Sequence, residues 1–142
     1  MALTLQQKLQ INDYLVKCTG SAFQWGINDC NTFAIQIFDI INNTNKLDKV
    51  KEKYYNKRSA IKFQKEYLSP RQIMHVNKFT ELTDIDFEWQ DGDVALVEHK
   101  YYATAYVYFN RVFWSVPEEQ ELTAYDPDTV KCAMTSGWRH NG

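Results

Sequence analysis

The fold is decided by the stretch FQWGINDCNTF, which occupies residues 23–33 of the 142-residue chain. Gly26 is a helix breaker, and Asn28 and Asp29 are residue types that cap the N-termini of helices. From Cys30 onward the apolar residues recur at the spacing of one helix face, at positions 33, 34, 37, 38 and 41. The stretch therefore predicts a loop, a cap, a cysteine in the first helical turn and a buried helix.

A cysteine in the first turn of a helix is a candidate nucleophile. Its thiol lies at the positive end of the helix dipole, near backbone N–H groups that have no partner within the helix. Both features favour the thiolate, which is the form that attacks an electrophile. Cys30 also fits a plainer interpretation, a small buried residue, because free cysteines are often buried. The surrounding residues decide between the two.

Outward from this stretch, helical patterns dominate the first half of the chain. Residues 5–18 and 59–68 carry apolar residues at helical spacing, and Ser69-Pro70 predicts the start of a further short helix. Beyond Phe79 the pattern changes to short runs rich in β-branched and aromatic residues. The predicted strands are residues 94–97, 101–109, 112–116 and 122–125, and residues 136–140 form either a last strand or a tail.

Helices first and antiparallel strands second predict an α+β fold. We expect one domain over residues 1–142, with the helix that begins at Cys30 packed on a small antiparallel sheet. Residues 98–100 are expected to form the turn of one hairpin and residues 110–111 that of the next.

Composition narrows the classes of function. The net charge is −2 and the isoelectric point is about 5.9, so bulk electrostatics favour neither nucleic acid nor an anionic membrane as a partner. Residues 46–58 are basic and aromatic, but Asp48 and Glu52 interrupt them, and we expect a solvated face rather than a nucleic-acid site. Three cysteines form neither a disulfide framework nor a zinc motif, and no metal or cofactor is expected.

No apolar run is long enough to span a membrane, and residues 1–10 lack the apolar core of a signal peptide. We therefore expect a protein made in the cytoplasm without a signal peptide and without a membrane span.

The pattern Phe-x-Trp-Gly-x-Asn-Asp-Cys at residues 23–30 resembles the nucleophile segment of papain-like cell-wall peptidases of the NlpC type. It is more similar to an uncharacterised phage and prophage branch of that superfamily. That branch continues with further landmarks, which correspond here to Tyr55, Ala60, the Gly-Asp-Val-Ala-Leu-Val strand at 92–97 and Trp138-Arg139. The resemblance spans about residues 23–139 and implies a papain-like fold, with N-terminal helices and the cysteine helix on a small antiparallel sheet.

The resemblance also implies roles for the residues that match the nucleophile segment. In the peptidases the cysteine at the helix start is the nucleophile, which maps onto Cys30. Asp29 takes the place of the aspartate before it and is expected to cap the helix or accept hydrogen bonds. Trp25 and Asn28 are expected to support the loop.

The family's general base is a histidine at the start of the strand after the Gly-Asp strand. In this chain Tyr102 or Ala103 falls at that position, and the nearest histidine is His99, three residues earlier in the expected turn. His99 serves as the base only if a bulge or a longer hairpin re-aims it, and an exposed turn histidine is the alternative.

Two hypotheses remain open at this point. In the first, the protein is a tail-associated phage protein that cleaves peptidoglycan, with Cys30 as nucleophile and His99 as base. In the second, it is a catalytically inactive structural component of the phage tail or virion that keeps the scaffold for assembly. Both imply a place in the virion with other virion or tail proteins as partners, and the first adds peptidoglycan.

Overall fold

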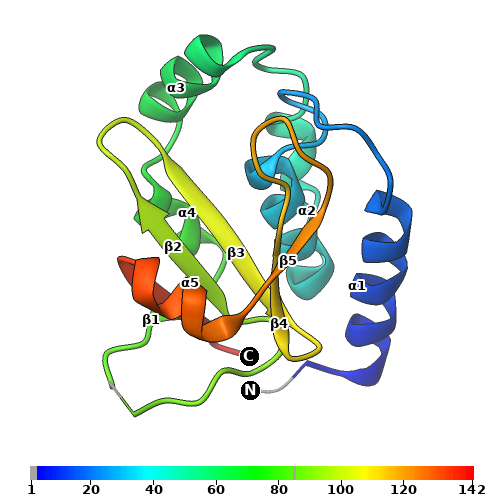
Figure 1. Cartoon of the computed structure of the whole chain (residues 1–142), viewed down its shortest axis with the longest axis vertical. Coiled ribbons are helices and arrows are strands. Elements are labelled where there is room, and N and C mark those ends of the chain that lie inside the picture. Colours follow the sequence, from blue (N-terminus) through cyan, green and yellow to red (C-terminus); the bar gives the residue numbers. More distant parts are fainter. Residues whose placement is uncertain (1–2, 85) are drawn as a thin grey trace.

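A computed structural model describes residues 3–84 and 86–142 (Figure 1). The helices are α1 (Leu5–Cys18), α2 (Cys30–Asn42), α3 (Lys57–Glu66), α4 (Pro70–Val76), α5 (Pro127–Ala133) and a short 3-10 helix, η1 (Lys46–Lys49). The strands are β1 (Phe79–Glu81), β2 (Val94–Glu98), β3 (Ala103–Phe109), β4 (Val112–Ser115), β5 (Thr123–Tyr125) and β6 (Ser136–His140). The predicted α+β class is confirmed.

The six strands form one antiparallel sheet in the order β1-β6-β2-β3-β4-β5. The meander from β2 to β5 follows the predicted hairpins, whereas β6 inserts between β1 and β2 from the end of the chain. α2 packs against one face of the sheet and α5 against the other. The last strand of the chain, β6, is therefore an interior strand of the sheet and pairs with both β1 and β2 (Figure 1).

The core forms where the apolar face of α2 meets one face of β3. Phe33, Ile37 and Phe38 are almost fully buried, as their helical spacing predicts. Along β3 the alternation places Ala103, Ala105, Val107 and Phe109 on the buried side, because successive side chains of a strand point to opposite faces. Alanine at the first two of these positions leaves room beside the start of α2.

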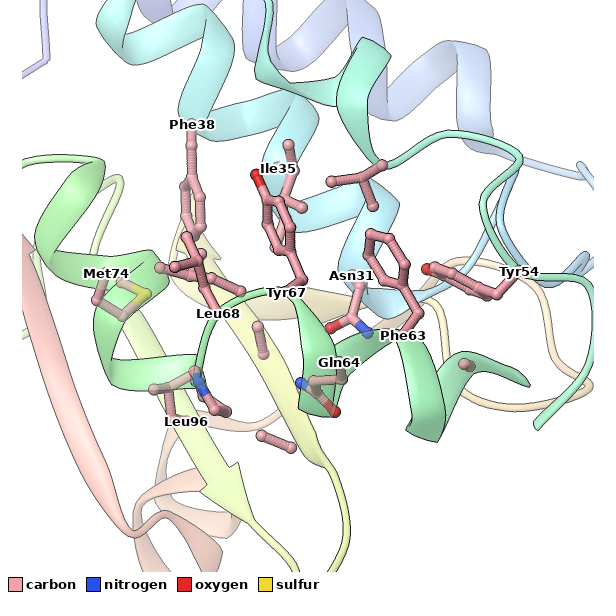
Figure 2. A pocket seen from close by; sticks show the side chains of 17 residues that line it. Asn31, Ile35, Phe38, Tyr54, Phe63, Gln64, Tyr67, Leu68, Met74 and Leu96 are labelled. Atoms are coloured by element: carbon pink, nitrogen blue, oxygen red, sulfur yellow. The ribbon is translucent and has the colours of Figure 1, made fainter. Parts of the chain in front are cut away.

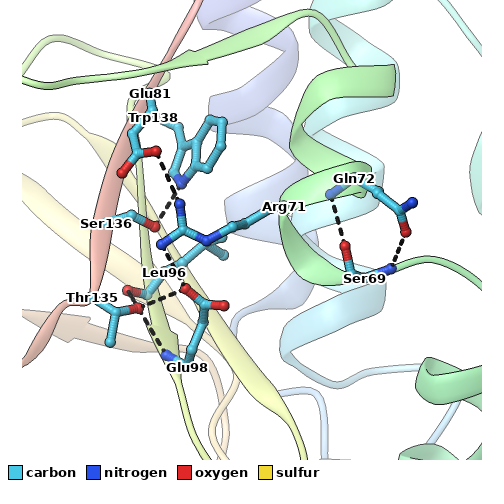
Figure 3. Close-up of polar contacts among 9 residues, drawn as sticks. All are labelled: Ser69, Arg71, Gln72, Glu81, Leu96, Glu98, Thr135, Ser136 and Trp138. Carbon is cyan, nitrogen blue, oxygen red and sulfur yellow. Dashed lines mark hydrogen bonds and ion pairs between the residues drawn. The ribbon is translucent and has the colours of Figure 1, made fainter.

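Capping side chains explain where α1 and α4 begin. The Thr4 hydroxyl accepts a hydrogen bond from the Gln7 backbone N–H, while the Gln7 side chain accepts one from the Thr4 N–H. Ser69 and Gln72 form the same reciprocal box at the start of α4 (Figure 3). These boxes satisfy N–H groups that have no partner within the helix, so the predicted starts are confirmed.

An ion pair joins the two C-terminal landmarks of the sequence. Arg139 Nε lies 3.0 Å from Asp93 Oδ1 and Arg139 Nη2 lies 2.8 Å from Asp93 Oδ2, so the contact is bidentate. The Asp93 side chain is only 2% exposed, and Arg139 Nη2 also donates to the Glu88 carbonyl at 2.7 Å. The Gly-Asp motif, directly before β2, and the Trp-Arg motif in β6 are thus neighbours, since Val94 pairs with Trp138.

A second arginine makes a more exposed network on the opposite side of Trp138. Arg71 Nη1 lies 2.9 Å from Glu81 Oε1, and Arg71 Nη2 lies 3.1 Å from Glu98 Oε1 (Figure 3). The guanidinium carbon is 5.9 Å from the centre of the Trp138 ring, whose Nε1 donates to Ser136 Oγ at 2.8 Å. Arg71 therefore ties α4 to β1 and β2.

The two arginines allow a matched test of how burial of an ion pair affects the free energy of unfolding. Arg139→Gln leaves the buried Asp93 carboxylate without its counter-ion, and we expect the free energy of unfolding to fall by about 3–5 kcal/mol. Arg71→Gln removes contacts to half-exposed carboxylates and should cost about 1 kcal/mol or less. Urea unfolding followed by tryptophan fluorescence measures both, and equal losses would contradict the difference.

Candidate functional site

A short closed loop delivers the chain to the cysteine. The Gln24 N–H donates to the Asn28 carbonyl at 3.0 Å, and the Asn28 N–H donates back to the Gln24 carbonyl at 2.8 Å. The Asn28 side-chain amide donates to the Ala22 carbonyl at 2.9 Å. Trp25 packs edge-on against Phe23, with ring centres 4.9 Å apart. The supporting roles expected for Asn28 and Trp25 agree with these contacts.

The buried carboxylate of Asp29 connects this loop to α2. Its Oδ1 accepts hydrogen bonds from the backbone N–H groups of Asn31 and Thr32 at 3.0 and 2.9 Å. Its Oδ2 accepts from the Gly26 N–H at 2.7 Å. Asp29 is only 2% exposed, and the capping role expected for it is confirmed.

Gly26 is the point at which a second segment docks on the loop. It has a φ of +78°, and a Cβ at this position would lie 2.2 Å from the carbonyl oxygen of Tyr54. The Gly26 carbonyl also accepts a hydrogen bond from the Glu52 N–H at 2.9 Å. Glycine is required here for both the backbone conformation and the close approach.

Tyr54 is a site residue that sequence reasoning missed. Its ring is buried, and its hydroxyl makes no hydrogen bond with any of the described residues. Burial and the nearby Asp29 carboxylate raise the pKa of the phenol, so it stays protonated. Tyr54 lines an apolar cavity of about 40 Å³ between α2, α3 and the sheet. Figure 2 shows its hydroxyl pointing toward Phe63 and Asn31, which line the same cavity. The nearby Tyr55 is instead exposed.

The thiol of Cys30 is held in its neutral form. Burial raises its pKa to about 12, with a further contribution from the Asp29 carboxylate. The backbone N–H groups of Ala105, Cys30 and Asn31 act in the opposite direction but are outweighed. The expectation that the helix start favours a thiolate at Cys30 is therefore wrong, because desolvation disfavours the charged form more than the helix terminus favours it.

Cys30 opens into a pocket of about 170 Å³. Phe23 and Trp25 contribute aromatic rings from the loop, and Tyr102 and Tyr106 contribute rings from the region of β3. The remaining wall comes from α3 and from residues 116–118, where Lys57 Nζ lies 3.4 Å from Glu118 Oε2. The pocket is mostly aromatic and apolar around the thiol, which suits binding of an uncharged group.

The structure does not bring His99 to Cys30. His99 is exposed in the β2–β3 hairpin and stacks on Tyr102, with ring centres 4.4 Å apart. Tyr102 lines both the cysteine pocket and a neighbouring groove, whereas His99 lines the groove and not the cysteine pocket. Tyr102 and Ala103, the two residues at which the sequence resemblance places the peptidases' histidine, both line the cysteine pocket.

The other two histidines are engaged elsewhere. His75 packs edge-on against Trp138, and His140 Nε2 lies 2.7 Å from Asn42 Oδ1. Among the described residues, no hydrogen bond joins the Cys30 thiol to an imidazole; its sulfur lies 3.9 Å from Asn31 Oδ1. No group of three or more His, Cys, Asp or Glu within 3–84 and 86–142 has the arrangement of a metal site.

Fold and site together define an α+β domain whose cysteine begins the central helix and faces a small antiparallel sheet. The chain belongs to the family described as "Domain of unknown function (DUF6950)", whose model matches residues 5–139. No curated protein matches the sequence. No helix in the described part of the chain has both the length and the apolar character needed to cross a membrane.

Substitutions at Gly20 and Gly26 distinguish the cost of a left-handed backbone from the cost of a steric clash. Gly20 has a φ of +79° with nothing near its Cβ position, so Gly20→Ala should cost only the left-handed conformation, about 1–2 kcal/mol. Gly26→Ala carries the same strain and also collides with the Tyr54 carbonyl, so it should cost clearly more. Thermal unfolding compares the two variants, and equal losses would show that segment 52–54 moves freely.

The neutral thiol makes a prediction for alkylation. In a Cys18→Ala, Cys132→Ser variant, Cys30 is the sole thiol. A rise in its pKa from 9.0 to about 12 lowers the thiolate fraction at neutral pH by about a thousandfold. We expect slow iodoacetamide labelling whose rate still increases above about pH 9. A chain that retains only the exposed Cys132 is the control, and a Cys30 rate that levels off below about pH 8 would contradict the prediction.

Proposed function

We propose that the protein is a non-hydrolytic structural component of a phage virion, associated with the tail, which keeps an NlpC-type papain-like scaffold. The scaffold is supported by the places of the resembling motifs. Cys30 begins α2, the Gly-Asp motif directly precedes β2, and Trp138-Arg139 lies on the neighbouring β6. The phage origin and the virion location rest on the resemblance of these motifs to the phage and prophage branch.

One observation carries the non-hydrolytic part of the proposal. Tyr102 and Ala103, either of which corresponds to the peptidases' general base in the sequence resemblance, line the cysteine pocket, whereas His99 does not line it and stacks on Tyr102. A thiol nucleophile needs a base within hydrogen-bond reach, about 2.6–3.2 Å or somewhat more without substrate. Without that base the thiol of Cys30 stays protonated at neutral pH.

A specific feature favours hydrolysis as a second candidate. The backbone N–H groups of Cys30, Asn31 and Ala105 act on the sulfur, and such donors also stabilise an oxyanion. The pocket next to them has room for a substrate group. Hydrolysis by this centre requires that another chain supplies the base.

Digestion of peptidoglycan separates the two candidates. We expect no release of peptides or muropeptides above the Cys30→Ser control when wild-type protein is incubated with purified sacculi, as measured by mass spectrometry. An active NlpC-type peptidase serves as the positive control. Release that disappears in Cys30→Ser would overturn the non-hydrolytic proposal. Proteomics of purified phage particles tests the virion location separately, and absence of the protein from the particles would refute it.

Restoring an imidazole tests the reason for inactivity. In the single-thiol background, Ala103→His should raise the rate of Cys30 alkylation at about pH 7 by tenfold or more, because an imidazolium stabilises the thiolate. Ala103→Gln, which has a similar size and no titratable group, should stay at the parent rate. Equal rates for the two variants would show that position 103 does not face the thiol closely enough to act as the base.

A further inference from the structure

A second site adjoins the cysteine pocket and shares Gln64, Tyr102 and Ala103 with it. It is a groove of about 350 Å³ between the end of α3 with its connection to α4, and the hairpin that joins β2 to β3. Figure 1 shows α3 and the tip of this hairpin at the same end of the molecule. A volume of this size is within the range of sites that hold a small-molecule or nucleotide-sized group.

The groove carries positive charge on both walls. Lys65 comes from α3 and Lys100 from the hairpin, and their ammonium groups lie 5.7 and 5.2 Å from the centre of the Tyr101 ring. Among the described residues that line the groove, Glu98 is the one carboxylate, and it already pairs with Arg71 at 3.1 Å. The charge left for a ligand is therefore positive.

The positive charge continues along α3 beyond the groove. Arg58, Lys62 and Lys65 follow one another at spacings of four and three residues, so they lie on one face of the helix. All three are exposed, and none takes part in an ion pair with the described residues. They form a track of about 10 Å, at 1.5 Å per helical residue, that leads into the groove.

The groove also offers aromatic rings. Tyr101 is 54% exposed and Tyr102 is 38% exposed. His99 stacks on Tyr102 at an interplanar angle of 26°, and its residue is exposed, so a further flat ring can extend this stack. Cations that follow a backbone, combined with rings on which bases stack, are the two features that bind single-stranded nucleic acid.

We propose that this groove and the adjoining face of α3 bind single-stranded nucleic acid. The phosphates lie along Arg58, Lys62, Lys65 and Lys100, and a base extends the stack on His99. An acidic peptide would use the cations but gain nothing from the rings. The inference concerns a different surface from the Cys30 pocket and does not depend on the proposed function.

Net charge alone argues against such a partner, and the sequence led us to expect none. The distribution of charge removes this objection. Eight of the 16 Lys and Arg residues fall within residues 46–65, together with only two acidic residues, Asp48 and Glu52. The acidic isoelectric point is therefore set by other parts of the chain.

Fluorescence anisotropy with a labelled single-stranded oligonucleotide of mixed sequence tests the proposal on the full chain. We expect binding at low salt, with a slope of log K against log salt of about −2 to −3 for three to four phosphate contacts. Lys65→Glu with Lys100→Glu should weaken binding by tenfold or more. Lys17→Glu with Lys131→Glu makes the same charge change on α1 and α5 and should weaken it much less.

His99→Ala and Tyr101→Leu test the stacking component. Both should weaken binding of the oligonucleotide several-fold while leaving the weaker binding of inorganic polyphosphate unchanged. Circular dichroism confirms that each variant is folded, which is expected because all the substituted residues are exposed. The proposal is overturned if no binding occurs at low salt, if both charge variants lose affinity equally, or if polyphosphate, polyglutamate or duplex DNA binds as tightly as the single strand.

Discussion

The buried carboxylate of Asp29 holds the loop at residues 23–28 to the start of α2, because one oxygen accepts from the helix and the other from Gly26. Gly26 in turn receives segment 52–54 through its carbonyl oxygen and its missing Cβ. The loop, the helix start and the segment that carries Tyr54 are therefore ordered by one charged group. Cys30 occupies its position because it follows this group in the chain.

The same carboxylate works against nucleophilic chemistry at Cys30. A negative charge next to the thiol raises its pKa, in addition to the effect of burial. An imidazolium on β3 would offset that charge and stabilise the thiolate. Ala103 and Ala105 provide no such group, so the interaction that builds the site also keeps the thiol neutral. The position of Cys30 at the helix start and the reactivity of its thiol are therefore set by different interactions.

Much of the fold follows from local sequence signals. The starts of α1, α2 and α4 follow from capping residues, and β3 follows from its aromatic and β-branched alternation. The short strand β1 was not predicted, since its pairing depends on β6, about 60 residues later. The Asp93–Arg139 pair was likewise not predicted, because the two residues meet only when the sheet is complete.

The sequence predicted where the residues at the start of α2 lie, but not the environment of the Cys30 thiol. Motif and spacing placed Cys30 at the helix start and Asp29 at the cap, both of which are local properties. The pKa of the thiol could not be predicted, because burial by β3 and Tyr54 is a tertiary effect that opposes the local dipole. The only sequence signal for Tyr54 was its position next to the Tyr55 landmark, and adjacent residues of an irregular segment do not reveal which of them is buried.

Tyr102 is shared by the two candidate binding surfaces of the molecule, the cysteine pocket and the groove. Lys57, which lines the pocket, has its Nζ 5.6 Å from the centre of the Tyr102 ring, and His99, which lines the groove, stacks on that ring. The hairpin exposes His99, Lys100 and Tyr101, none of which lines the cysteine pocket. Tyr102 therefore places the exposed His99 next to the cysteine pocket, although no hydrogen bond among the described residues joins that imidazole to the Cys30 thiol.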